Sequence, residues 1–94
     1  MRDRRNLKIR GVVQGVFFRE TVCRIASRYD VHGFVRNVGH ETVEIEVEGE
    51  PNVVSAFIGD LLAHPPRAAR IEDVRSMSAP ALGEVGFFIA PSVR

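Results

Sequence analysis

The residues with the clearest chemical potential lie in a short turn that runs from Gln14 to Arg19 and contains Gly15. An alternating apolar segment ends before this turn and an amphipathic segment begins at Phe18, so the turn should join a strand to a helix. Such a turn directs backbone N–H groups and the positive end of the helix at one point, which creates an anion site. The Arg19 guanidinium adds a planar fork of donors, and phosphate is the preferred ligand. Because most such turns bind nothing, a second element is needed.

Two motifs supply that element. The segment from Gly11 to Arg19 reads G-V-V-Q-G-V-F-F-R and resembles the acylphosphatase signature G-x-V-Q-G-V-x-F-R at every fixed position. Residues 33–37 read G-F-V-R-N and are similar to the second family motif, G-x-V-R-N. The family's Pro-Pro after the second helix and its G-F-x-I ending near Gly86 also recur. The resemblance implies a hydrolase without metal or cofactor that cleaves the carboxyl–phosphate bond of acyl phosphates.

The resemblance also implies a role for individual residues. Arg19 looks like the family's phosphate-binding arginine, and Asn37 looks like the asparagine that orients the attacking water. The side chains of Phe17 and Phe18 are expected to pack rather than to touch substrate. The remaining substrate contacts are expected from the turn, mainly through its backbone amides, and involve Gln14, Gly15, Val16, Phe17 and Phe18.

The chemistry of an acyl phosphate suits this set of residues. The substrate is a mixed anhydride whose carboxylate leaves without needing a proton, so no general acid is required. Arg19 and fixed amides would neutralise the phosphoryl oxygens, while Asn37 would place a water in line with the breaking bond. The Asn37 amide can donate and accept hydrogen bonds but cannot act as a base. The resemblance implies that the substrate's own phosphate takes the proton.

The elements that must position these residues follow from the spacing of apolar residues. Alternation over residues 7–13 predicts a first strand, and the spacing from Phe18 predicts a helix that ends near Asp30. Further strands are predicted over residues 34–37, 43–47, 71–77 and 87–89. A second helix should begin at Glu50-Pro51 and end at His64-Pro65-Pro66, with a buried stripe of Val54, Phe57, Ile58, Leu61 and Leu62.

This order is β-α-β-β-α-β with an additional C-terminal strand. Right-handed strand–helix–strand crossovers would place both helices on one face of a mostly antiparallel sheet. The predicted fold class is therefore a ferredoxin-like α/β (α+β) sandwich, and residues 1–94 are expected to form a single acylphosphatase-like domain. The hairpin departs from the family, which usually has glycine where this chain has Glu41, so we expect it to turn around Gly39.

Two groups of charged residues are assigned no function. Alternation with valine and isoleucine predicts that Glu44, Glu46 and Glu48 form a solvated row on one strand face. The basic residues near the N-terminus are expected to form a solvated, frayed end, and they are Arg2, Arg4, Arg5, Lys8 and Arg10.

Composition limits the partners. The 94 residues carry a formal net charge of +1, which does not predict binding to nucleic acid or to a membrane surface. The single cysteine, Cys23, cannot form an intrachain disulfide, and no signal-peptide or membrane-spanning pattern is present, so a cytoplasmic monomer is expected. Cys23 is interpreted as a packed thiol. No metal site is predicted, because the histidines are scattered and suit surface or capping roles, namely His32, His40 and His64.

Two other functions fit parts of the sequence. An RNA-binding module shares the β-α-β-β-α-β order, but the predicted first and third strands lack the aromatic residues on which such modules stack bases. A domain of a hydrogenase-maturation carbamoyltransferase would use the same signature on carbamoyl phosphate. The motifs hold the phosphate and do not identify the acyl group.

Overall fold

The computed structural model describes residues 2–94, which form a five-stranded sheet with two helices. The sheet order is β4-β1-β3-β2-β5, and neighbouring strands are antiparallel except for the parallel pair of β2 and β5. The predicted ferredoxin-like order with an additional C-terminal strand is confirmed. The elements are β1 (Asp3–Val12), α1 (Phe18–Ala26), β2 (Val31–Val38), β3 (Thr42–Gly49), α2 (Pro51–Ala63), β4 (Arg70–Ala79) and β5 (Phe87–Ile89).

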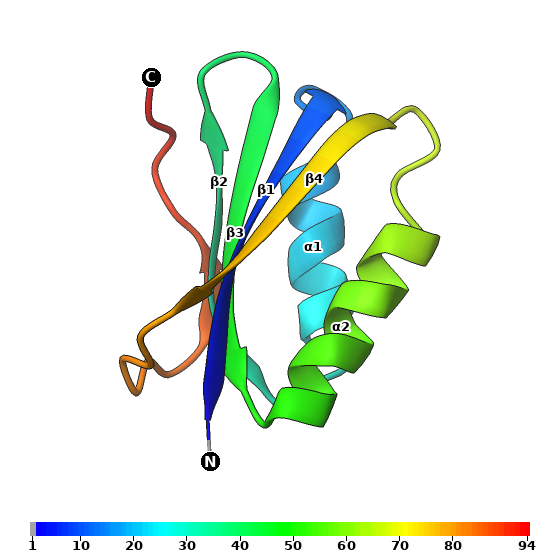
Figure 1. Ribbon diagram of the computed structural model, residues 1–94. Coiled ribbons are helices and arrows are strands. Elements are labelled where there is room, and N and C mark those ends of the chain that lie inside the picture. Colours follow the sequence, from blue (N-terminus) through cyan, green and yellow to red (C-terminus); the bar gives the residue numbers. More distant parts are fainter. Residues whose placement is uncertain (1) are drawn as a thin grey trace.

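The hydrophobic core lies between the sheet and the two helices, which cover the same face (Figure 1). Each strand turns alternate residues toward the helices, as Leu7 and Ile9 do on β1. The predicted stripe of α2 is narrower than expected, since Leu62 is 37% exposed. Leu62 lies about 100° around the helix from the buried Leu61, which carries it to the rim of the contact.

The first helix is shorter than the sequence predicts. It ends at Ala26, and the chain continues through two tight turns in which the N–H groups of Arg28 and Tyr29 donate to carbonyls three residues earlier. Tyr29 still packs on the core, with its ring edge against Phe57 at 6.2 Å between centroids. The apolar period therefore continues past the helix, which explains why the prediction extended it to Asp30.

The hairpin between β2 and β3 confirms the expected turn. Gly39 has φ of 61°, a left-handed conformation that glycine adopts without strain, and residues 39–41 connect the strands. The Glu41 carbonyl accepts a hydrogen bond of 2.9 Å from the N–H of Gly11, which fixes the hairpin against β1.

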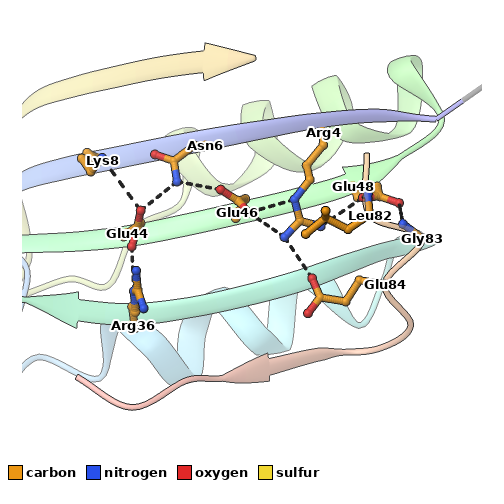
Figure 2. A network of polar contacts seen from close by, with 10 residues as sticks. All are labelled: Arg4, Asn6, Lys8, Arg36, Glu44, Glu46, Glu48, Leu82, Gly83 and Glu84. Carbon is orange, nitrogen blue, oxygen red and sulfur yellow. Dashed lines mark hydrogen bonds and ion pairs between the residues drawn. The ribbon is translucent and has the colours of Figure 1, made fainter. Parts of the chain in front are cut away.

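The expectation of a solvated glutamate row is wrong. Glu48 is 0% exposed and Glu44 is 7% exposed, although both lie on the face opposite the helices. Residues 80–86 fold over this face, and the N–H groups of Leu82 and Gly83 donate to the two Glu48 oxygens at 2.7 and 2.9 Å (Figure 2). Alternation predicts which face a side chain occupies, but it does not predict that a distant loop covers the face.

The expected fraying of the basic N-terminus is wrong because β1 pairs with β3 and β4, although Arg2, Lys8 and Arg10 are exposed as predicted. β1 begins at Asp3, and Arg4 is only 2% exposed. Its guanidinium contacts three carboxylates, of which Glu48 lies at 3.0 Å, Glu46 at 2.6 Å and Glu84 at 3.0 Å (Figure 2). We call these four residues the Arg4 cluster; it fastens the loop of residues 80–86 to the sheet.

A second set of polar contacts continues along the same face. Glu44 accepts hydrogen bonds from Arg36 at 2.7 Å and from Asn6 at 2.8 Å (Figure 2). It also forms an ion pair with Lys8, whose Nζ lies 3.9 Å from Glu44 Oε2. Burial by itself raises the pKa of Glu44, but these donors and cations outweigh it and hold the pKa below its ordinary value. Within residues 2–94, no helix is both long and apolar enough to cross a membrane.

Candidate active site

A small open cavity of about 170 Å³ lies where the end of β1, the start of α1 and the end of β2 meet. Figure 1 shows these segments at one end of the molecule, beside the β2–β3 hairpin and the C-terminus. Val16, predicted with the others, does not line the cavity and packs against the core. Six of the lining residues were predicted from the sequence, namely Gln14, Gly15, Phe17, Phe18, Arg19 and Asn37. The other two, Val13 and Glu20, were not predicted.

The loop between β1 and α1 has the shape of an anion cradle. Gly15 has φ of 71° and Phe17 has φ of 60°, so two residues of the loop are left-handed. Phe17 precedes the first residue of α1, and no side chain caps that helix. The first N–H groups of α1 therefore remain available to an anion at the positive end of the helix.

Arg19 supplies the cation of the cavity. It is the second residue of α1 and is half-buried. Its guanidinium makes no hydrogen bond or ion pair with any of the described residues 2–94. Arg4 differs, because its guanidinium forms ion pairs with carboxylates. The N–H donors of Arg19 are therefore available to an anionic ligand.

Asn37 enters the cavity from β2. Alternation places it on the same sheet face as the fully buried Val35, at the end of the strand nearest the loop. Its side-chain oxygen Oδ1 is buried and receives no hydrogen bond from the described part of the chain, residues 2–94. A buried acceptor without a donor is unfavourable unless a small polar molecule can reach it, and Asn37 is one of the residues that line the cavity.

Gln14 connects the two sides of the cavity. Its Nε2 donates to the carbonyl of Gly39 at 3.1 Å and to the carbonyl of Thr42 at 2.9 Å. Both carbonyls belong to the β2–β3 hairpin, which carries Asn37. The side chain of Gln14 thereby holds the loop that precedes Arg19 at a fixed place relative to Asn37.

The two phenylalanines of the loop differ. Phe18 is 2% exposed and packs in the core, as predicted. The packing predicted for Phe17 is wrong, because its side chain is 76% exposed at the edge of the cavity. Its backbone is left-handed, and its carbonyl accepts hydrogen bonds from the N–H and hydroxyl of Thr21 at 3.0 and 2.9 Å.

The other titratable candidates lie outside this cavity. Cys23 packs half-buried against the core, and burial, followed by the nearby Glu20, raises the pKa of its thiol, which disfavours a nucleophile. His64 caps α2, and the ring of His32 accepts a hydrogen bond from the N–H of Gly86 at 2.9 Å. His40 is exposed. Among the residues described, no three His, Cys, Asp or Glu side chains gather as a metal ion would require.

The family model for acylphosphatase matches residues 5–89, which is most of the chain. The chain belongs to the acylphosphatase family. An acylphosphatase of Acidovorax sp. (strain JS42) is 42% identical over 83 residues, covering 88% of this chain and 84% of the relative. Hydrolysis of the carboxyl–phosphate bond is the activity that this membership supports.

Solved structures agree with the family and with the fold. The crystal structure of acylphosphatase from Bacillus subtilis matches with a TM-score of 0.86 at 27% identity, covering 96% of this chain and 99% of that one. Full-length HypF in its phosphate- and nucleotide-bound form matches with a TM-score of 0.93 at 33% identity. That match covers 99% of this chain but 12% of HypF, so the acylphosphatase fold also occurs as one part of a much longer protein.

Proposed function

We propose that the protein hydrolyses acyl phosphates in this cavity, with Arg19 and Asn37 as the catalytic residues. The observation that carries the proposal is the meeting, in one cavity, of an unpaired half-buried guanidinium and a buried amide oxygen without a donor. The first group suits the phosphoryl oxygens, and the second suits a water molecule.

The phosphoryl group binds in the loop between β1 and α1. Backbone N–H groups of Gly15, Phe17 and Phe18 surround it, and the Arg19 guanidinium spans two of its oxygens. These donors stabilise the charge that spreads over the phosphoryl oxygens as the bond to the acyl group lengthens. The leaving carboxylate is already a stable anion, so no acid has to protonate it.

Asn37 positions the attacking water. Its Oδ1 accepts a hydrogen bond from the water and thereby turns a lone pair of the water oxygen toward phosphorus. Attack in line with the breaking bond expels the carboxylate, and the proton of the water passes to a phosphoryl oxygen, because Asn37 cannot hold it. The products are a carboxylate and inorganic phosphate.

The same proposal describes a metal-independent monomer in the cytoplasm. The charge of Arg19 takes the place that a metal ion would have. The single cysteine supports a reducing compartment. We propose no nucleic-acid partner, because β1 and β3 carry no aromatic side chain on which a base could stack.

A second function is favoured by the HypF match, whose TM-score of 0.93 exceeds the 0.86 of the Bacillus subtilis enzyme. The chain would then act on carbamoyl phosphate as part of a carbamoyltransferase. Parallel assays with benzoyl phosphate and carbamoyl phosphate distinguish the two functions, since a carbamoyltransferase domain should prefer carbamoyl phosphate.

Purified protein is expected to hydrolyse benzoyl phosphate at the same rate with and without excess chelator. Inorganic phosphate should raise the apparent KM without changing kcat, because it competes for Arg19 and the loop amides. The measurement is the steady-state rate over a matrix of substrate and phosphate concentrations. Activity that vanishes with chelator and returns with zinc or magnesium would overturn metal independence, and inhibition that leaves the apparent KM unchanged would exclude the loop as the site.

Asn37→Ala is expected to fold and to bind phosphate while its kcat falls by about a hundredfold, because the lost amide positions water and not the phosphoryl group. The checks are kcat, the phosphate inhibition constant and circular dichroism. Asn52→Ala, at an exposed residue of α2, is the matched control and should behave as wild type. Near-normal kcat in a folded Asn37→Ala variant would remove Asn37 from the mechanism.

A further inference from the structure

We propose that the exposed ring of Phe17 binds the acyl group of the substrate and makes the protein prefer acyl phosphates with an apolar or aromatic body. This inference rests on the proposed function of the cavity and adds a residue that selects among its substrates. It concerns the Phe17 side chain, whereas the phosphate cradle uses the backbone N–H of this residue.

The first observation is the exposure of a large apolar side chain at the edge of an anion site. Phe17 is 76% exposed, while the adjacent Phe18 is 2% exposed. Phe17 lines the same cavity as Arg19 and Asn37. Among the aromatic rings of residues 2–94, Phe17 makes no ring–ring contact, so its surface is open to a ligand. An acyl phosphate has the matching composition, with a charged phosphoryl end and an apolar acyl end.

The second observation is the backbone of the same residue. Within residues 2–94, Phe17 is the only residue other than glycine with positive φ, and its φ of 60° costs on the order of 1 kcal/mol or more. Glycine would adopt this conformation without strain and would expose no apolar surface. Neither the strain nor the exposure stabilises the fold, so both features of Phe17 point to a role in binding.

The geometry of the reaction identifies which part of the substrate meets the ring. The N–H groups of the loop and the Arg19 guanidinium satisfy the phosphoryl oxygens, which an aromatic ring cannot do. In-line displacement places the water and the leaving carboxylate on opposite sides of phosphorus. The acyl group therefore extends out of the amide cradle toward the cavity edge, where Phe17 supplies apolar surface.

The experiment compares kcat/KM for benzoyl phosphate with kcat/KM for acetyl phosphate. In Phe17→Asn the ratio of the two should fall by about tenfold relative to wild type, because asparagine tolerates the left-handed backbone but removes the ring. Phe17→Gly, which relieves the strain, should show the same fall. Phe17→Tyr keeps an aromatic ring and should keep the wild-type ratio.

Two controls separate this role from a general effect on the loop. Phe88→Asn replaces a phenylalanine that is 47% exposed on β5 and does not line the cavity, and it should keep the wild-type ratio. The phosphate inhibition constant of each Phe17 variant reports whether the cradle is intact. An unchanged ratio in Phe17→Gly, or an equal loss with both substrates, would overturn the inference while leaving the proposed function standing. Absence of hydrolysis by wild type would instead refute the proposed function.

Discussion

Arg19→Lys is expected to lose nearly as much activity as Arg19→Ala, with kcat/KM reduced by about a hundredfold or more in both. A guanidinium presents a flat fork that spans two phosphoryl oxygens, whereas an ammonium is a compact charge on a flexible stem. Arg19 is held in the first turn of α1 and has no other partner within residues 2–94, so its donors serve the ligand alone. Charge without the fork leaves the phosphoryl group incompletely neutralised.

The measurement is steady-state hydrolysis of benzoyl phosphate by wild type and both Arg19 variants, with circular dichroism to establish folding. Arg24→Lys is the matched control, because Arg24 is an exposed residue of the same helix that does not line the cavity. It should retain wild-type activity. If Arg19→Lys kept about half of the wild-type rate, Arg19 would supply only bulk charge, and the description of the site as a shaped phosphate clamp would be wrong.

Arg4→Ala is expected to cause the largest loss of stability. Removing the guanidinium leaves Glu46 without its cation and leaves the fully buried Glu48 with only the half-exposed Arg2, whose Nε lies 3.0 Å from Glu48 Oε2. Breaking a buried ion pair on one side costs about 3–5 kcal/mol, and we expect about 3 because only one loop covers the Arg4 cluster. Urea denaturation measures the change. Arg5→Ala is the control, because Arg5 is the next residue in the chain and its side chain is 38% exposed. It should lower the free energy of unfolding by less than about 1 kcal/mol.

The effect of Arg4→Ala should depend on pH. Burial raises the pKa of Glu48, but the N–H of Leu82, the Arg4 guanidinium and other donors outweigh it and lower the pKa below its ordinary 4.5. A carboxylate with a lowered pKa in the folded state contributes stability above its unfolded pKa and loses it as the pH falls through the folded value. The difference in unfolding free energy between wild type and Arg4→Ala should therefore shrink below pH 4.5. A constant difference down to pH 3 would show that Arg4 does not stabilise the Glu48 charge.

The order of the elements could be predicted from the sequence because each has a local pattern. Alternation identifies β3, and Gly39 marks the turn that joins it to β2. The cavity residues could also be predicted, because Gln14 to Arg19 are contiguous and Asn37 belongs to a second short motif. These features depend on neighbours in the chain.

The features that escaped prediction depend on residues distant in the chain. Glu48 is buried because Leu82 and Gly83 cover it, and the sequence around Glu48 contains no pattern that predicts this loop. Arg4 is buried by the same loop. Phe17 escaped for a different reason: apolar residues are expected inside, but Phe17 combines a positive φ with an exposed side chain, and φ cannot be read from residue type.

The place of β1 in the sheet has a consequence for how the chain folds during synthesis. β1 is made before both of its partner strands, β3 and β4, and Arg4 lies opposite both Glu48 and Ala79. Leu7 and Ile9 therefore emerge from the ribosome long before either partner strand exists. Pairing between such distant segments requires costly loop closure, which makes folding slow for a chain of this size. Until β4 is complete, the free edge of β1 can pair with other nascent chains, so the period before residue 79 appears is the one in which aggregation threatens the protein most.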